Sequence, residues 1–381
     1  MTGADPAVNG RPAPALLGRG VLVVGSGLLG TSIGLALRRA GVEVRLRDRD
    51  PRALAEAERL GAGHADYRAD YRADDPAHDR AGPPASIAVV AVPPAATGAV
   101  VTAVLAEGAA EYATDVASVK AMPVSQVAAA AAEPGRYVGG HPMAGREVSG
   151  AQNALVDLFE GRPWVLCPDS GTDPHAVTRA LAVVRAAGAV PVTMPPAEHD
   201  AAVALVSHAP HVVAALMAGR MLDAPDHEVR LAGQGVTDVT RVAAGDPALW
   251  TEILASNSAA VADVLRRLRG DLDRVLEALD SDGGPVLGEL LAAGANGRAR
   301  LPGKHGEPHV EYATIAVVVD DRPGQLAALF ADAGAAGVNI EDVRIEHSPG
   351  QPMGTVELDV RPEAGGELVA GLRKRGWTVH E

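Results

Sequence analysis

The stretch VLVVGSGLLG, residues 21–30, decides the fold of the first half of the chain. Its four leading apolar residues predict a buried strand, and the glycines at 25, 27 and 30 predict a tight turn that opens a helix. Such a turn lets a pyrophosphate approach the backbone, although a glycine-rich turn without a ligand has the same pattern. We therefore predict a dinucleotide site that consists of Gly25, Ser26, Gly27, Leu28, Leu29 and Gly30.

An acidic residue follows at the distance expected for the ribose of a dinucleotide. Asp48 ends the second predicted strand, 18 residues after Gly30. A carboxylate at this place accepts hydrogen bonds from the ribose hydroxyls, which favours NAD over NADP. Arg47 and Arg49 flank Asp48, and either could meet the 2′-phosphate of NADP, so NADP stays open as an alternative cofactor.

Apolar runs and helical patterns alternate through the first 170 or so residues. Further strands are predicted at 86–92, 112–116 and 136–139. This alternation predicts an α/β fold with a parallel sheet of the Rossmann type. Ligands of such sheets lie at the carboxyl ends of the strands. Val92 and Pro93 fall at one of these ends and are predicted to contact the cofactor.

Changes of composition divide the chain into five segments. A strand is predicted at 164–167, and the helical segment after it has predicted helices at 174–187, 196–222, 228–243 and 247–279. These helices are apolar on most sides, which predicts packing of helix against helix across a homodimer interface. The last segment has the order βαββαβ, with its second strand predicted at 338–346, and this order is typical of a ferredoxin-like fold. The expected segments are a flexible leader (1–19), the Rossmann domain (20–168), an all-helical substrate and dimerisation domain (169–285), a Gly- and Pro-rich linker (286–310) and a small regulatory domain (311–381).

Composition disfavours several kinds of partner. The formal net charge of -14 argues against nucleic acid and anionic membranes. The single cysteine, Cys167, cannot form an internal disulfide and suits a reducing compartment. The N-terminal residues lack the apolar core of a signal peptide, and charge, Gly or Pro interrupts every long apolar run. We therefore expect a cytoplasmic protein without a membrane span.

Three polar clusters carry the candidate chemistry: TDVASVK (114–120), GHPMAGREVSG (140–150) and HDAAVALVSHAPH (199–211). Taken singly, each has an ordinary explanation, since Ser118 could cap a helix and His141 could lie in a turn. The histidines of the third cluster have a spacing that metal ligands also show. However, a proline intervenes and no cysteine or carboxylate completes the set, so we predict no metal.

Together the clusters resemble the prephenate/arogenate dehydrogenase family of tyrosine biosynthesis, over about residues 20–300. The matching motifs are TDxxSxK, HPMAGxExSG, HDxxxAxxSHxPH, DVTR (238–241) and DPALW (246–250), in that order. The resemblance implies NAD-dependent oxidative decarboxylation of prephenate to 4-hydroxyphenylpyruvate. Hydride leaves C4 of the cyclohexadienyl ring, CO2 leaves C1, and the ring becomes aromatic.

Two alternatives remain within the oxidoreductases. Arogenate dehydrogenase, which converts arogenate to tyrosine, is close, because no motif distinguishes the keto group of prephenate from the ammonium group of arogenate. A β-hydroxyacid-type dehydrogenase is more distant. Such enzymes use a catalytic lysine in the helical domain, and residues 151–300 contain no lysine.

The resemblance also implies roles for individual residues. His141 is the expected base at the C4 hydroxyl, and Ser118 is expected to orient it and to touch the nicotinamide. Arg241 is expected to hold a substrate carboxylate, and His211 the substrate side chain. The other expected substrate contacts are Glu147, Ser207, Asp238 and Trp250, of which Trp250 could equally be a core residue.

The last segment resembles an ACT domain in the stretches DDRPGQL (320–326) and GVNIED (337–342). That family binds amino acids between paired domains, so the resemblance implies feedback control with tyrosine as the effector. A dimerisation module without a ligand is the alternative. The expected effector contacts are Pro323, Gly324, Asn339 and Ile340.

Overall fold

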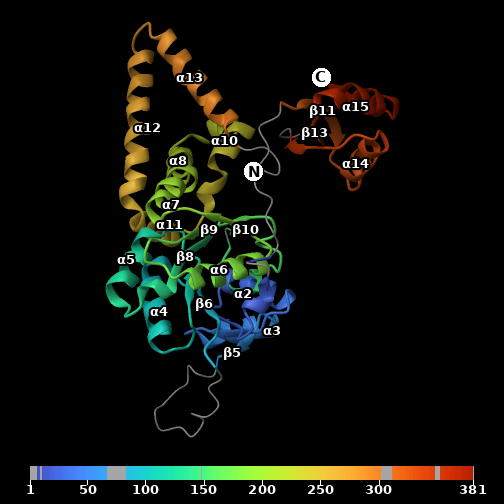
Figure 1. Cartoon of the computed structure of the whole chain (residues 1–381). Helices are drawn as coiled ribbons and strands as arrows, with labels where there is room; N and C mark the ends of the chain where they lie inside the picture. Colours follow the sequence, from blue (N-terminus) through green and yellow to red (C-terminus); the bar gives the residue numbers. More distant parts are fainter. Residues whose placement is uncertain are drawn as a thin grey trace. The chain divides into compact units, whose positions relative to one another are not determined.

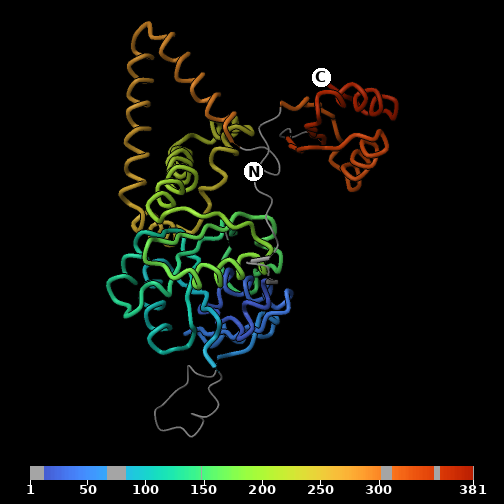
Figure 2. Tube along the Cα trace, in the orientation of Figure 1, coloured from blue at the N-terminus to red at the C-terminus, as the bar shows by residue number. Residues whose placement is uncertain are grey.

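The computed structural model describes residues 7–8, 11–66, 83–146, 148–301, 311–347 and 352–380. The chain divides into two compact units, Met1–Leu268 and Arg269–Glu381 (Figures 1 and 2). Each unit is described by itself below.

The first unit is built on an eight-stranded sheet with the order β10-β9-β8-β7-β6-β3-β4-β5. The six strands from β3 to β8 are parallel, and their order is that of the Rossmann fold. The predicted α/β class and parallel sheet are therefore confirmed. The strands are β3 (Val21–Val24), β4 (Val44–Arg47), β5 (His64–Ala65), β6 (Ile87–Val90), β7 (Ala113–Asp115), β8 (Tyr137–Pro142), β9 (Pro163–Cys167) and β10 (Val190–Thr193).

The sheet continues beyond the expected end of the domain. β9 runs antiparallel to β8, and β10 pairs parallel with β9. The predicted boundary at residue 168 is therefore wrong, because it falls between two strands that share one hydrogen-bonded sheet. The apolar run after Pro163 predicted β9, but the short β10 gave no comparable signal.

Helices cover both faces of this sheet (Figure 1). Alternate residues of a strand point to opposite faces. Val21 and Val23 accordingly belong to the core that includes residues of α2 and α6, whereas Leu22 and Val24 belong to the core with residues of α4 and α5. The helices are α2 (Leu28–Arg39), α3 (Pro51–Arg59), α4 (Pro94–Ala106), α5 (Ala121–Ala130) and α6 (Pro174–Ala186), with short 3-10 turns at Pro134–Arg136 and Ala151–Asn153.

The expected flexible leader is wrong for its described second half. Residues Ala7–Val8 (β1) pair with Arg11–Pro12 (β2), and Ala13–Leu16 form the helix α1. Ala13 and Leu17 are buried in the same core as α6. These two apolar residues are one helical turn apart and therefore share a face, which anchors this segment.

The helical part of the first unit begins at Pro196. The predicted helices 228–243 and 247–279 are each interrupted, the first at Gly233, whose backbone is extended, and the second at Asn257. The elements are α7 (Pro196–Val203), a π-helical segment (Ala204–His208), α8 (Ala209–Gly219), a 3-10 turn (Arg220–Leu222), α9 (Asp226–Val229), α10 (Gln234–Thr240), a 3-10 turn (Arg241–Ala244), α11 (Pro247–Ser256) and α12 (Ser258–Leu279).

One helix among the described residues, Pro196–Leu222, is long and apolar enough to cross a membrane by length and composition alone. One such helix is weak support for a membrane span, because core helices pass the same test. His199, Asp200 and His208 are buried along it and hydrogen-bond to other parts of the first unit. These contacts attach one side of the helix to the rest of the first unit, and 33% of its most apolar window is buried.

The second unit contains the end of α12 from Arg269 on, α13 and a small α/β domain. α13 (Gly284–Ala299) occupies most of the predicted linker, so that expectation is wrong for residues 286–299. Pro285 lies in its first turn, where proline is tolerated, and VLGELLAA supplies good helix formers. The linker's remaining residues 302–310 lie outside the described ranges.

The small domain confirms the predicted ferredoxin-like order. Its sheet has the order β12-β13-β11-β14 with antiparallel neighbours, and its apolar residues form a core of their own. The second strand begins at Asp342 rather than at the predicted residue 338. The elements are β11 (Ala313–Asp320), α14 (Gln325–Ala335), β12 (Asp342–His347), β13 (Met353–Val360), α15 (Pro362–Lys374) and β14 (Thr378–His380).

Candidate active site

The glycine-rich turn has the geometry of a phosphate cradle. Gly25 has a φ of 102°, and a Cβ there would lie 2.2 Å from the Ala91 carbonyl oxygen. A Cβ at Gly30 would lie 1.8 Å from the Gly25 oxygen, so these two positions admit only glycine. A Cβ at Gly27 would meet nothing within 4 Å. The buried Ser26 hydroxyl has no partner among the described residues. The turn therefore leaves open space, and a spare hydroxyl, at the N-terminus of α2.

The two arginines that flank Asp48, at the end of β4, have different surroundings. Asp48 accepts a hydrogen bond from the Ser26 amide at 2.5 Å, which places the carboxylate beside the turn. Arg47 forms ion pairs of 2.8 Å with both Asp66 and Glu107. Arg49 is exposed and forms no ion pair with any residue that the structure describes. Of the two arginines, only Arg49 is therefore available to a ligand.

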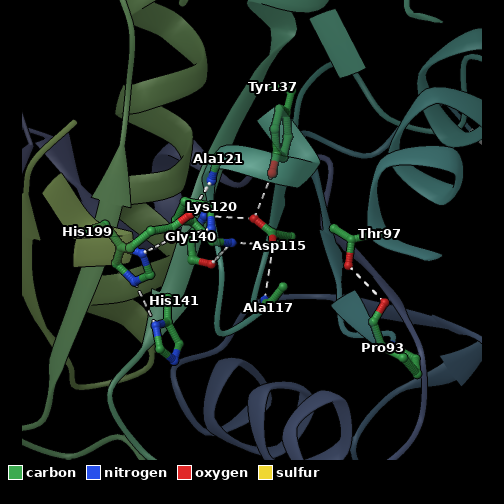
Figure 3. Close-up of polar contacts among 11 residues, drawn as sticks. Pro93, Thr97, Asp115, Ala117, Lys120, Ala121, Tyr137, Gly140, His141 and His199 are labelled. Atoms are coloured by element: carbon green, nitrogen blue, oxygen red, sulfur yellow. Dashed lines mark hydrogen bonds and ion pairs between the residues drawn. The ribbon is translucent and has the colours of Figure 1, made fainter. Parts of the chain in front are cut away.

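His141 lies near the end of β8 and heads a short chain of hydrogen bonds. Its Nδ1 lies 2.8 Å from Nε2 of His199 (Figure 3). Nδ1 of His199 lies 2.8 Å from Oδ1 of Asp200. Asp200 also accepts hydrogen bonds from the amides of Lys120 (2.7 Å) and Ala121 (2.8 Å) at the start of α5. Sequence reasoning missed the roles of His199 and Asp200, although both stand in the HD pair of the third motif.

The surroundings keep His141 uncharged. Burial lowers the pKa of His141 well below the ordinary value of 6.5, and the nearby His199, Lys120 and His208 lower it further. A histidine with a lowered pKa is neutral near pH 7 and can accept a proton. Figure 3 shows its second ring nitrogen pointing away from His199.

A buried ion pair holds the backbone next to His141. Lys120 and Asp115 are both fully buried and form an ion pair through Nζ and Oδ2. Lys120 Nζ also donates to the Gly140 carbonyl at 2.6 Å, while Asp115 Oδ1 accepts from the Gly140 amide at 2.8 Å. Both polar groups of the residue before His141 are therefore fixed (Figure 3). The TDxxSxK motif contained this pair, but the sequence gave no reason to join it to Gly140.

Ser118 does not play its expected orienting role in this structure. Its hydroxyl oxygen is buried and has no hydrogen-bond partner among the described residues. His199, rather than Ser118, contacts Nδ1 of His141. Ser118 follows the end of β7, so its free hydroxyl lies where the ligands of a Rossmann sheet bind.

A cavity of about 300 Å³ adjoins the loop after His141. His211 and Trp250 line it and stack with their ring centroids 3.5 Å apart and planes 11° apart. Nδ1 of His211 is buried without a partner among the described residues, and burial lowers the pKa of His211. Arg146, which sequence reasoning missed, brings a guanidinium to the same cavity. The lining residues are Gly145, Arg146, Val148, Ser149, His211, Val242, Gly245, Asp246, Leu249, Trp250 and Ile253.

The other expected substrate residues are less closely gathered. Arg241 is exposed and does not line the cavity, although its neighbour Val242 does. Asp238 accepts a hydrogen bond from Gln234 at 2.7 Å. Ser207 is half-buried in the π-helical segment. Glu147 lies outside the described residues.

The expected cofactor loop after β6 leads directly into α4. Val92 is half-buried and Pro93 is exposed just before that helix. Pro93 accepts a hydrogen bond from Thr97 at 3.2 Å (Figure 3). Glu252 of α11 accepts a hydrogen bond from the Ala95 amide at 3.1 Å. The helix that carries Trp250 is thereby joined to the loop beside the dinucleotide turn.

In the small domain, the expected effector residues lie at the ends of α14 and before β12. Gly324 precedes α14 with a φ of 89°, and Asn339 donates to Glu341 at 2.7 Å. A cavity of about 70 Å³ lies next to Gly324, but none of the four expected residues lines it. Its lining residues are Val319, Asp320, Asp321, Arg322, Leu326, Ile345, Gly354 and Val356.

No three His, Cys, Asp or Glu side chains have the arrangement of a metal site in the part of the chain that the structure describes. His199 and Asp200 are engaged with each other, and His208 accepts from Asn257 at 3.1 Å.

A Rossmann sheet with an open phosphate turn, and a neutral buried histidine near the end of a neighbouring strand, define a dinucleotide-dependent dehydrogenase. The comparisons give the particular family. The model of the prephenate dehydrogenase nucleotide-binding domain matches residues 33–193, and that of the prephenate dehydrogenase dimerization domain matches residues 195–293. The chain belongs to the prephenate dehydrogenase family.

Individual relatives agree with this assignment. The probable prephenate dehydrogenase NovF of Streptomyces niveus is 38% identical over 95% of this chain and 99% of its own length. The prephenate dehydrogenase of Aquifex aeolicus, solved with hydroxyphenyl propionate and NAD+, has a TM-score of 0.60 and 26% identity, covering 73% of this chain and 97% of that one. The arogenate dehydrogenase of Synechocystis has a TM-score of 0.60 and 28% identity, covering 73% and 98%.

Proposed function

We propose that this protein oxidises and decarboxylates prephenate to 4-hydroxyphenylpyruvate with NAD, as a step in tyrosine biosynthesis. The observation that carries the proposal is the half-buried His141, whose pKa is held low, whose Nδ1 is bonded to His199 and whose Nε2 is directed away from it. Such a nitrogen is suited to take the proton of the C4 hydroxyl as hydride leaves C4.

The residues of the Rossmann turn fit NAD. Gly27 leaves room for the pyrophosphate, the N-terminus of α2 faces it, and Asp48 lies where the ribose hydroxyls would bind. When bound, the nicotinamide supplies the hydride acceptor. The unpartnered hydroxyls of Ser26 and Ser118 are the groups of this chain that would hydrogen-bond to the cofactor. Val92 and Pro93 would flank it.

The chain's own contribution is to position the ring and to accept a proton. His141 Nε2 takes the hydroxyl proton, and the carboxylate at C1 departs as CO2 because the ring becomes aromatic. In the cavity, His211 offers an unpartnered Nδ1 to the substrate side chain, and Trp250 stacks behind it. Holding the substrate in the reactive orientation is the larger part of such catalysis.

Arg146 favours prephenate over arogenate. Both substrates carry one carboxylate on the ring and a second on the side chain, but the prephenate side chain has a keto group where the arogenate side chain has an ammonium group. Arg146 lines the cavity together with His211 and with Asp246, whose carboxylate accepts from the Ala248 amide. A guanidinium attracts the side-chain carboxylate of either substrate, whereas it repels the ammonium group that only arogenate carries.

Steady-state kinetics test this function. The wild type should show the highest kcat/KM with prephenate and NAD, among the four pairings of prephenate or arogenate with NAD or NADP. His141→Asn should lower kcat by about 10²- to 10⁴-fold while NAD binding, followed by cofactor fluorescence, is retained. Arg241→Gln should mainly raise the KM for prephenate. Turnover of His141→Asn at the wild-type rate would exclude this chemistry.

We also propose that the protein is a cytoplasmic homodimer whose C-terminal domain is an ACT domain that binds tyrosine. Support comes from the matched dimerization domain, the single buried cysteine and the ferredoxin-like topology. Inhibition assays with tyrosine at up to millimolar concentration test the effector. A lack of response would leave the small domain as a dimerisation module.

A further inference from the structure

We propose that His199 and Asp200 are positioning residues that fix the tautomer of His141, with the proton on Nδ1 and the lone pair on Nε2. The inference rests on the proposed function for its catalytic meaning. Its structural content, the tautomer of a resting histidine, stands without that function. His199 and Asp200 are adjacent on α7, whereas His141 comes from β8, so the helical part of the first unit sets the state of a residue on the Rossmann sheet.

The protonation states of the three hydrogen-bonded residues follow from that of Asp200. Asp200 accepts two backbone amides, one on each oxygen, at 2.7 and 2.8 Å. These hydrogen bonds, with that of His199, lower the pKa of Asp200 against the opposing effect of its burial. An ionised carboxylate can only accept. The proton between Asp200 and His199 must therefore reside on Nδ1 of His199.

The same reasoning applies to the hydrogen bond between His199 and His141. An imidazole that carries a single proton, on Nδ1, has a lone pair on Nε2 and can only accept there, and we assign this form to His199. Nδ1 of His141, 2.8 Å away, must then be the donor. Since neutral imidazole carries one proton, Nε2 of His141 is left as a free base. Every link in this chain is buried or half-buried, so water does not readily substitute for a partner.

His199 and Asp200 also stabilise the positive charge that forms on His141 during the reaction. When the C4 hydroxyl proton moves to Nε2, His141 becomes an imidazolium that still donates through Nδ1. The negative charge of Asp200 lies one imidazole ring away and is largely shielded from water, so its attraction is stronger than in bulk solvent. The charge of Lys120 opposes it but is paired with Asp115. No further proton moves along the hydrogen bonds from His141 to Asp200 in this step, and the hydride leaves C4 for the nicotinamide.

The charged and titratable groups around His141 determine how a substitution shifts its pKa. His199 and Asp200 lie on α7, His208 lies on the π-helical segment, Lys120 lies before α5 and Asp115 ends β7. Asp200 is the group whose negative charge reaches His141 through His199. Its removal should lower the pKa of His141 and move the acidic limb of the rate profile to lower pH.

Asp200→Asn is the decisive variant, because an amide can donate to Nδ1 of His199 and reverse every proton in the chain. We expect kcat to fall by about 10²- to 10⁴-fold at unchanged NAD affinity, with KM for prephenate within about threefold. The acidic limb of the pH profile should move down. His199→Phe should lose as much activity, whereas His199→Gln, whose carbonyl can still accept from His141, should regain part of it.

Nitrogen NMR of histidine-labelled holoprotein reads the tautomer without turnover. The His141 signal, assigned by its loss in His141→Asn, should be that of the Nδ1-protonated form in the wild type and should change in Asp200→Asn. Asp173→Asn is the matched control, because Asp173 pairs with His175 at 3.0 Å on an exposed helix start. It should leave both the signal and the pH profile unchanged.

The outcomes separate the inference from the proposed function. An Nε2-protonated His141 in the wild type, or an unmoved acidic limb with a proportional loss of rate at every pH in Asp200→Asn, would overturn the inference. If Asp200→Asn does not fold, His199→Phe and His199→Gln decide by the same NMR signal and pH profile. Full activity in His141→Asn would instead overturn the proposed function and leave the tautomer measurement standing.

Discussion

Gly140 is a single residue on which the site depends for steric reasons. A Cβ at this position would lie 2.5 Å from the Asp115 carbonyl oxygen and 2.8 Å from Oγ1 of Thr114. Backbone atoms cannot yield as a flexible side chain can. The strand that carries His141 is thereby held close to β7, and His141 is kept in register with the end of the sheet.

Gly140→Ala should therefore both destabilise the fold and displace His141. We expect a loss of about 1–3 kcal/mol in the free energy of unfolding, with a fall in kcat larger than any rise in KM. Thermal unfolding and prephenate kinetics measure the two effects. Gly219→Ala is the control, because a Cβ there meets nothing within 4 Å. Equal stabilities for the two variants would show that the sheet relaxes around the added methyl group.

The buried ion pair of Lys120 and Asp115 is a second feature at the scale of single residues. Removing one member of a buried ion pair leaves the other charge uncompensated, which costs about 3–5 kcal/mol. Lys120→Met should lose that amount in chemical denaturation, and the double variant with Asp115→Asn should recover part of it. Arg267→Met, which breaks the exposed pair with Asp263, should cost about 0–1 kcal/mol. A cost for Lys120→Met as small as that of the exposed pair would contradict the assigned burial.

Single residues were predictable from the sequence where a short motif carries its own chemistry. The glycines of the turn are of this kind, because their backbone geometry depends on near neighbours in the chain, whereas the roles of Asp48 and His141 stay predictions. His199, Lys120 and Arg146 act through partners that are distant in sequence, and pairing across the fold leaves no local pattern. The exposed position of Arg241 and the lack of a partner for Ser118 could not be foreseen for the same reason.

At the scale of elements, the π-helical segment Ala204–His208 joins two helical halves that share one partner. Asn257 donates to the Asp200 carbonyl at 2.8 Å and to His208 at 3.1 Å. Asp200 lies before the segment, and His208 lies at its end. The wider π turn accommodates one extra residue between the two halves of the helix.

Deleting Leu205, which is 58% exposed, should convert this segment to regular helix. A π turn holds one residue more than an α turn, so the residues after the deletion keep nearly the same rotation relative to α7, and His208 and His211 stay near Asn257 and Trp250. We expect kcat/KM and the helical content by circular dichroism to stay close to those of the wild type. Leu205→Ala separates loss of the side chain from loss of the residue. A large fall of kcat/KM in the deletion variant alone would mean that the π turn itself holds the site in place.

Helices and strands were predicted well where apolar residues recur regularly along them, and poorly where a single side-chain contact ends them. The well-predicted elements include the strands β3 and β6 and the helix Pro196–Leu222. Asn257 interrupts a helical pattern because its side chain bonds to Asp200 and His208, which composition cannot reveal. Conversely, glycines in α13 suggested a linker, although the five consecutive residues 289–293 all favour a helix.

At the scale of the whole molecule, α12 presents an apolar stripe without a partner in the chain as described. Leu268, Leu272, Leu276 and Leu279 recur at helical spacing and are 37%, 54%, 59% and 64% exposed. An exposed stripe of large apolar residues is characteristic of an interaction surface. The helix lies within the region matched by the family's dimerization domain, so the occupant that fits the proposed homodimer is a second copy of this chain.

The double variant Leu272→Glu/Leu276→Glu tests the proposed homodimer through this stripe. Two carboxylates at the centre of an apolar contact would have to be buried without partners, which opposes association. Light scattering after size exclusion should give a dimer for the wild type at micromolar concentration and a monomer for the variant. Arg274→Ala, on the opposite side of the same helix, should remain dimeric. A variant that stays dimeric would move the interface elsewhere, whereas a monomeric wild type would refute the dimer itself.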